Sequence, residues 1–325
     1  MRRCFLCAAD MLGPTDRTLV FPDGTRRGYA LACGSCGLLL SMFLSPEDCR
    51  RDLEKRLRAP SFAPDPAAPY GLDVYTLRTA ATVLGRGIRP EGARGRAELL
   101  APHGSHAALA TLFDLAPKRG RVSLGLLCRP GDLPAVLASL PDHAVWTDDV
   151  AILVDDDPRA PRPLDVGGFP PGGVRVASRP LNGDFAGQRN ALQDLGESPW
   201  MLQLDADEDL APGTGCLLPA VAALAEEGDA LSIGLPRRNC VDGVLSDMYP
   251  DVQYRLNRSA VRYAGRVHER PDTGGWQRGF ISLHGRIVHQ LDGAHVRARS
   301  QRYEALSPGR GRLEEEGALL RPYAD

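Results

Sequence analysis

The sequence lacks the features that several classes of protein require. Its longest apolar stretch, residues 36–44, is far too short to cross a bilayer, so no membrane span is predicted. The formal net charge of −2 gives no general electrostatic reason to expect nucleic acid as a partner. No Gly-X-Gly-X-X-Gly follows a predicted strand, so the usual fingerprint of a methyltransferase is missing.

The start of the chain also lacks the marks of an export signal. Met1, Arg2 and Arg3 run directly into a cysteine pair, so we expect no signal peptide. Four of the eight cysteines are scattered singly, at positions 49, 128, 216 and 240, which suits a reducing compartment. With 325 residues, 43% of them hydrophobic, the chain can bury a full core, and we predict a cytoplasmic protein of two or three units.

Strands and helices are predicted to alternate after residue 120. Apolar runs at 121–128, 150–154, 173–177 and 200–204 are typical of buried strands. A helix is predicted at 130–140, with proline and aspartate in its first turn, and another begins near Asp184. Short alternating units of this kind indicate an α/β domain with a largely parallel sheet.

The last of these strands leads directly to Asp205 and Asp207. Residues i and i+2 of an extended chain point to the same side, so both carboxylates can face one cation. At the carboxyl edge of an open α/β sheet, that cation can bind a diphosphate. Carboxylate oxygens suit Mg²⁺ or Mn²⁺. Taken alone, Asp-X-Asp is also common in acidic turns before a helix.

A second and independent pattern lies at the start of the chain. Cys4 and Cys7 form one Cys-X-X-Cys pair, and Cys33 and Cys36 form another after 25 intervening residues. Four thiolates in two tight turns predict a tetrahedral, structural Zn²⁺ site. So small a segment cannot bury enough apolar area to fold alone, so the metal would stabilise it. Two disulfides or one redox-active pair are the alternatives.

The remaining segments connect these two patterns. Ser45 and Pro46 are a good helix start, residues 59–70 read as a linker, and helices are predicted at about 72–84 and 97–115. We therefore divide the chain into a zinc ribbon (1–44), a helical connector (45–118), a catalytic domain (119–295) and a tail (296–325) without assigned chemistry.

Five short segments, taken in order and spacing, resemble glycosyltransferase family 2, whose nucleotide-sugar-binding fold is of the GT-A kind. Their pattern matches the subgroup that includes transferases for cell-envelope glycans, and it covers about half of the chain. The resemblance implies a mixed sheet flanked by helices. The segments are Leu-Val-Asp at 153–155, Asp-Phe-Ala-Gly-Gln-Arg-Asn-Ala-Leu at 184–192, Leu-Asp-Ala-Asp-Glu at 204–208, Tyr-Pro-Asp-Val-Gln-Tyr-Arg-Leu-Asn-Arg at 249–258, and Gly-Arg-Val-His-Glu at 265–269.

The resemblance also implies roles for individual residues. It implies that Asp207 coordinates the metal directly, that Asp205 contacts ribose or metal, and that a late histidine, His289, adds a ligand. The nucleotide base and phosphates would contact Asp155, Arg189 and Asn190. After Asp155 the family usually continues with a Ser/Thr/Gly-rich loop, whereas this chain has a stiff proline-rich segment at 156–163, which leaves the nucleotide open.

Inverting transfer needs a base that takes the proton from the attacking acceptor. Glu269 is the first candidate and Asp251 the second, while His268 could orient that carboxylate or satisfy a buried backbone group.

The resemblance thus implies a metal-dependent, inverting glycosyltransferase that uses a nucleoside-diphosphate sugar. Its acceptor could be a glycan, a lipid-linked intermediate, a natural product or a peptide. A sugar nucleotidyltransferase is one alternative, but it needs a Gly-rich basic loop after the first strand, and residues 128–131 do not supply one. An inactive zinc-ribbon adaptor is another, and the intact Asp205 and Asp207 count against it.

Overall fold

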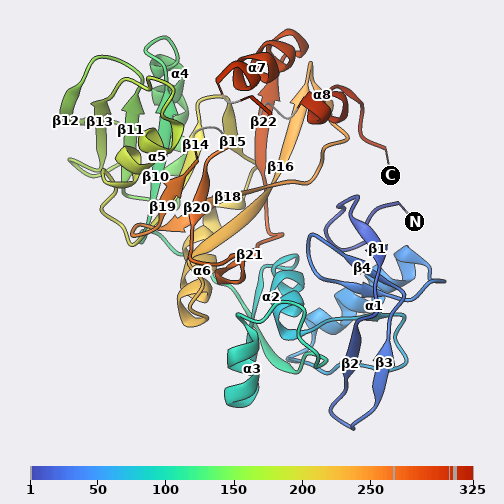
Figure 1. Cartoon of the computed structure of the whole chain (residues 1–325). Coiled ribbons are helices and arrows are strands. Elements are labelled where there is room, and N and C mark those ends of the chain that lie inside the picture. Colours follow the sequence, from blue (N-terminus) through green and yellow to red (C-terminus); the bar gives the residue numbers. More distant parts are fainter. Residues whose placement is uncertain (1, 266–267, 307, 310–312, 325) are drawn as a thin grey trace.

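The computed structural model describes residues 2–265, 268–306, 308–309 and 313–324. It is a mixed α/β protein in which a large sheet domain lies beside an N-terminal unit (Figure 1). No helix among the described residues is both long and apolar enough to cross a membrane.

The first half of the large sheet is parallel, as the alternating pattern predicts. Its buried apolar strands are β10 (Val122–Cys128), β11 (Val150–Val154), β13 (Val174–Ser178) and β14 (Trp200–Asp205). Apolar residues on both faces are expected where helices cover both sides of a parallel sheet. The proline-rich segment after Asp155 is not a loop: it forms β12 (Arg159–Leu164), an exposed edge strand, where proline is tolerated because no partner needs its missing N–H.

The second half makes the sheet mixed rather than largely parallel. The full order is β12-β13-β11-β10-β14-β18-β16-β22-β15, and β17 and β21 also pair with β16. Strand β18 runs antiparallel to both β14 and β16, whereas β22 is parallel to β16. The bounds are β15 (Glu208–Leu210), β16 (Ser232–Val241), β17 (Val244–Leu245), β18 (Asp251–Arg258), β21 (Gly279–Ile281) and β22 (Ile287–Leu291).

Helices pack on this sheet and along its edge. The helix predicted near Asp184 is confirmed as α5 (Phe185–Gln193), with the Asp184 side chain accepting a hydrogen bond from Gly187 N at 2.9 Å. The helix predicted at 130–140 is α4 (Leu133–Ser139), followed by the 3₁₀ turn η1 (Leu140–His143). The others are α6 (Thr214–Glu227), α7 (Gly293–Leu306) and α8 (Leu313–Leu320). A hairpin of β19 (Arg262–Ala264) and β20 (Arg270–Asp272), then η2 (Trp276–Arg278), precede β21.

The main hydrophobic cluster of the N-terminal unit includes the cysteine pairs and residues of α1, α2 and several strands up to Leu112, and a smaller cluster is formed by Leu19, Phe21, Tyr29, Leu39 and Ala107. Strand β7 (Tyr70–Gly71) extends the sheet β1-β4-β5 that carries the second cysteine pair, so the predicted ribbon and connector share a sheet. The bounds are β1 (Leu12–Pro14), β2 (Thr18–Val20), β3 (Arg26–Gly28), β4 (Leu31–Cys33), β5 (Leu39–Leu40), β6 (Ser61–Phe62), β8 (Arg86–Pro90) and β9 (Ala110–Asp114).

The connector is not purely helical. Its first two predicted helices are confirmed as α1 (Pro46–Arg58), capped by Ser45, and α2 (Val74–Thr82). The helix predicted over 97–115 is wrong: α3 (Gly92–Glu98) ends early, and β9 forms a sheet with β6 and β8. Along β9, Ala110 and Leu112 are buried while Thr111 and Phe113 are more exposed, an alternation of period two that belongs to a strand.

Candidate functional site

A cavity of about 660 Å³ lies at the carboxyl end of β10, β11 and β14, a size usual for small-molecule sites. Strands β18 and β22 and the C-terminal helices supply further walls, so the tail takes part in the site. Seven predicted residues line it together: Asp155, Arg189, Asp205, Asp207, Asp251, Glu269 and His289.

Asp205 is held by two guanidinium groups. Arg189 Nη2, from α5, lies 2.9 and 3.0 Å from its two carboxylate oxygens, and Arg255 Nη2, from β18, lies 2.9 Å from Oδ2. Burial alone would raise the pKa of Asp205, but the two arginines outweigh it and hold that pKa well below its ordinary value. Asp205 is therefore a carboxylate whose oxygens already have cationic partners.

Asp207 has a different environment, since its side chain is 48% exposed and its partner is His289, whose Nε2 lies 3.2 Å from Oδ2. Asn239 donates through Nδ2 to Asp251 at 3.0 Å, which turns its Oδ1 toward His289 Nδ1 at 2.8 Å. An amide oxygen only accepts, so Nδ1 carries the hydrogen. The other ring nitrogen, Nε2, then faces the Asp207 carboxylate.

The separation of these two atoms suits a hard dication. Two neighbouring ligands of an octahedral ion with bonds of 2.0–2.1 Å lie about 3.0 Å apart, close to the 3.2 Å between Asp207 and His289. Asp207 and His289 could therefore hold such an ion, with the remaining positions open to the cavity.

The charges around Asp207 do not balance. Within the described part of the chain, five carboxylates and three guanidinium groups belong to one continuous network of ion pairs and hydrogen bonds that reaches Asp207 through His289, and the carboxylates exceed the guanidinium groups by two negative charges. Among the described residues, Asp207 is the carboxylate of this network without an arginine partner. The members are Asp205, Asp207, Glu208, Asp251, Glu269, Arg189, Arg237 and Arg255. A divalent cation would neutralise the excess.

The two candidate bases are both ionised but differently held. Glu269 accepts from Arg189 Nε; burial raises its pKa, and Arg189 and Arg255 more than reverse that effect. Asp251 accepts from Arg237, Asn239 and Gln253, and these donors outweigh burial and lower its pKa to about 2. Residues 266 and 267 of the segment before Glu269 lie outside the described residues.

The opposite end of the cavity contains Asp155, directly after β11. Leu181 N donates to its Oδ1 at 2.8 Å, and Cys128, Arg129 and Phe185 line the same region. Asn190 does not lie in the cavity: its amide exchanges two hydrogen bonds with the backbone of Tyr263, at 3.0 and 2.7 Å, and so fixes the β19–β20 hairpin to α5.

Sequence reasoning gave no role to Arg237 and Arg255, two of the three arginines that bind this carboxylate cluster. A signal was available for one of them. Asp251, Gln253 and Arg255 alternate along β18 and so share one face of the strand, which could have marked Arg255 as facing the aspartates.

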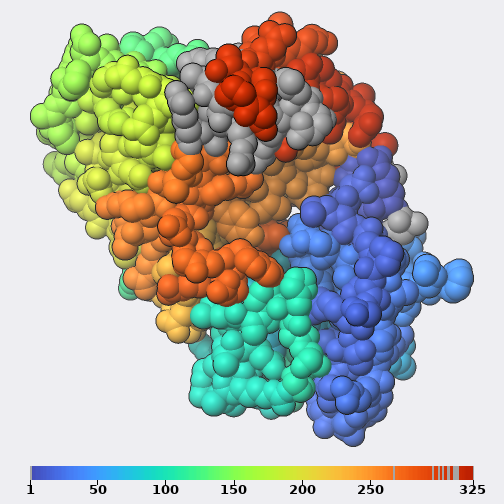
Figure 2. Space-filling model, viewed as in Figure 1, coloured from blue at the N-terminus to red at the C-terminus, as the bar shows by residue number. Residues whose placement is uncertain are grey.

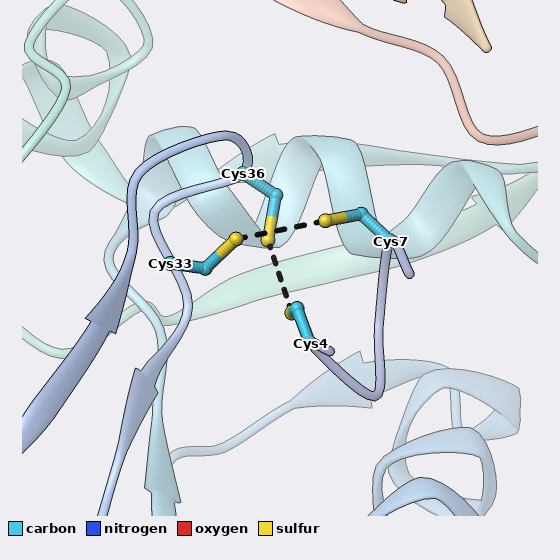
Figure 3. Close-up of side chains that lie close together, drawn as sticks. All are labelled: Cys4, Cys7, Cys33 and Cys36. Atoms are coloured by element: carbon cyan, nitrogen blue, oxygen red, sulfur yellow. Dashed lines mark hydrogen bonds between the residues drawn. The ribbon is translucent and has the colours of Figure 1, made fainter. Parts of the chain in front are cut away.

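The four cysteines of the N-terminal unit converge as their spacing predicts (Figure 3). All are buried and free, with Sγ–Sγ distances of 3.7 Å for Cys4–Cys36 and 3.6 Å for Cys7–Cys33. Four sulfurs at about 2.3 Å from a tetrahedral zinc lie about 3.8 Å apart. The cluster could therefore hold a metal ion, whereas two disulfides are not what the structure contains.

No family model matches the chain, and no curated protein does. Solved structures of S. aureus TarS match part of it. TarS 1–349 aligns with a TM-score of 0.31 and 11% identity over 55% of this chain and 63% of that one, and the same protein in complex with UDP gives 0.30, 10%, 55% and 63%. A longer TarS structure gives 0.30 and 11%, over 61% of this chain and 41% of that one. The chain thus spans less than two thirds of the length of these proteins.

Proposed function

We propose that this protein is a metal-dependent glycosyltransferase that moves a sugar, with inversion, from a nucleoside diphosphate to an acceptor nucleophile. The observation that carries the proposal is the pairing of Asp207 with His289 inside a network that has two uncompensated negative charges. The order of the five sequence segments, which resembles family 2, supports the same activity.

Asp207 and His289 would hold Mg²⁺ or Mn²⁺. When bound, a hard dication stabilises the negative charge that the departing diphosphate acquires. Asp205 then has a positioning role, because Arg189 and Arg255 fix its carboxylate so that it keeps the end of β14 in place and faces the ribose. Asp155, whose other oxygen accepts no hydrogen bond from a described residue, is free to accept one from the nucleotide base.

Glu269 is the better candidate for the base. An attacking hydroxyl must give its proton to a carboxylate that can still accept a hydrogen bond. Both carboxylate oxygens of Asp251 already accept hydrogen bonds, and its pKa is about 2, so its affinity for a proton is low. Glu269 lines the cavity, and its Oε1 accepts a hydrogen bond from Arg189 Nε.

For the cysteine cluster we propose Zn²⁺ in a structural role. Four thiolates complete its coordination shell and leave no position for a substrate. Free thiols in all eight cysteines are compatible with a reducing, cytoplasmic location, which we also propose.

A thermal-shift screen of nucleoside diphosphates and their sugars, with and without Mn²⁺, tests the function. A donor present at 100 times its Kd stabilises the folded state by about 2.7 kcal/mol. We expect one nucleotide to raise the Tm only with the cation, and the matching nucleotide sugar to be slowly hydrolysed. Binding of no nucleotide, or equal binding with EDTA, would overturn the proposal.

A further inference from the structure

Arg3, the residue before the first metal-site cysteine, joins three distant segments of the chain. Its side chain is only 6% exposed, and its guanidinium lies 4.4 Å from the centre of the Tyr323 ring. Figure 2 shows the first residues, in blue, beside the C-terminal segment, in red. The guanidinium donates to Ala8 O at 3.0 Å, Asp247 O at 3.0 Å, Tyr249 O at 2.7 Å, Ala324 O at 2.9 Å and the Asp247 carboxylate.

Asp247 is the centre of this junction. Its carboxylate is 1% exposed and pairs with Arg2 at 2.7 Å, Arg321 at 2.8 Å and Arg3. Hydrogen bonds from these arginines, that of Arg2 first, hold the pKa of Asp247 far below its ordinary value. The backbone N of Asp247 also donates to Arg321 O at 2.8 Å. The loop between β17 and β18 is thus held by residues from both ends of the chain, Arg2 and Arg3 near the N-terminus and Arg321 near the C-terminus.

This loop leads directly to the proposed donor site. Met248 lines the cavity, and Asp251, at the start of β18, belongs to the charge network. Ser246 Oγ donates to Ala318 O at 2.9 Å, which attaches α8 to the loop, and Leu319 of that helix lines the cavity as well. The loop therefore positions one wall of the cavity and part of its cover.

We propose that Arg3 is a positioning residue that couples the metal-bound cysteine turn to the wall and cover of the donor cavity. The cysteine turn fixes the backbone that directly follows Arg3, since Cys4 N donates to Ala9 O and Ala8 N to Cys4 O, each at 2.9 Å. A planar guanidinium uses several acceptors at once only when its backbone is held in one place. The kinetic consequence rests on the proposed function, whereas the structural coupling does not.

Hydrogen exchange measures the coupling without any substrate. In the metal-loaded wild type, a chelator should raise exchange in segments 245–251 and 315–324 by about tenfold, the order expected when charged hydrogen bonds are lost. Helix α5 is the internal control and should not change. Chelation that exposes the cysteine turn but leaves 245–251 protected would overturn the proposal.

The Arg3→Lys variant, with Arg2→Lys as the matched control, identifies the residue responsible. Arg2 also reaches Asp247, but it is 39% exposed, and its hydrogen bonds go to the side chains of Asp10 and Asp247. Arg3→Lys should raise exchange in both segments about tenfold with metal content unchanged, and chelation should then add little, because the two changes act on one contact. Arg2→Lys should change hydrogen exchange in these segments less than about twofold. Equal effects of the two variants would refute the assignment.

Hydrolysis of the donor measures the effect of Arg3→Lys on the kinetics. Arg3→Lys should raise KM for the donor about tenfold and change kcat less than about threefold, because it alters the shape of the binding site and leaves the reacting groups in place. An equal loss in kcat and kcat/KM would contradict a positioning role. If the wild type turns over no donor while the exchange results hold, the proposed function fails and the coupling stands.

Discussion

The cysteine cluster and the proposed metal site at Asp207 differ in the features that distinguish a structural metal site from a catalytic one. The cysteine cluster is closed: four identical soft ligands, all buried, face one another. The Asp207 site is open: one half-exposed carboxylate and one histidine face a cavity, beside a network that lacks two positive charges. A closed site stabilises a fold, whereas an open one leaves positions for a substrate. Substitutions at the two sites should therefore differ in whether they change the fold or the chemistry.

The largest effect is expected from Cys33→Ser. Zinc binding to four thiolates contributes on the order of 10 kcal/mol to folding, so losing one ligand should unfold the N-terminal unit. We expect the metal content to fall from one ion per chain and exchange to rise throughout residues 2–112. Cys49→Ser is the control, because Cys49 is buried in the same hydrophobic cluster but lies outside the four-cysteine group. A variant that keeps its zinc and its Tm would show that the cluster is not structural.

Asp207→Asn should affect chemistry and leave the fold unchanged. We expect donor turnover to fall about a thousandfold, the usual loss when an electrostatic stabiliser of the leaving group is removed. The Tm should change little because Asp207 is half-exposed. Asp209→Asn is the matched control, two residues further along and more exposed. Full turnover in Asp207→Asn would remove the open metal site from the mechanism.

Asp205→Asn should mainly lower the stability of the fold, whereas Asp207→Asn should mainly lower donor turnover. It leaves Arg189 and Arg255 without the carboxylate that both contact. Because Asp205 is only partly buried and each arginine keeps a second carboxylate, we expect a loss of about 1 to 3 kcal/mol in the free energy of unfolding. Urea unfolding of the two variants separates them. Equal stability of both would mean that the two aspartates do not have the distinct environments described above.

The sequence allowed the prediction of features that local patterns determine. The strands at β10, β11, β13 and β14, the caps at Ser45 and Asp184, and the cysteine cluster all follow from short-range periodicity or spacing. The antiparallel pairing of β14 with β18 brings Arg255 to Asp205, 50 residues away along the chain, and no local pattern encodes this pairing. Asn190 is a second example. The family resemblance implied a contact with the nucleotide, whereas its amide binds the backbone of Tyr263, a partner far along the chain.

Glu269→Gln tests the proposed base with a smaller expected effect. Loss of general base catalysis typically lowers a rate by about a hundredfold or more. We expect that loss in kcat for transfer to an acceptor, with nucleotide binding in thermal shift unchanged. Asp251→Asn is the comparison: if it lowers kcat more than Glu269→Gln at equal nucleotide affinity, then Asp251 is the base.

The smallest effect concerns acid stability and Asp251. Its pKa of about 2 in the folded state, against an ordinary 3.8, means that its ion pair stabilises the protein by about 2 kcal/mol above pH 4 to 5. That contribution is lost as the pH falls from about 4 toward 2. The difference in free energy of unfolding between wild type and Asp251→Asn should therefore shrink over this range. Asp142→Asn, a change at an exposed position outside the charge network, is the control.

Acid also acts on the cysteine cluster, so the titration must separate the two regions. Protons compete with zinc for the four thiolates, and a metal-bound unit loses its ion as the pH falls. Zinc release can be followed with a chromogenic chelator in the same samples. The difference in free energy of unfolding between wild type and Asp251→Asn can change either at the pH of zinc release or between about pH 4 and 2, where Asp251 is protonated. If it changes with zinc release, the acid sensitivity is due to the cysteine cluster. If the difference persists in a metal-free sample, it belongs to the network around Arg237, where Asp251 provides one of the two carboxylates.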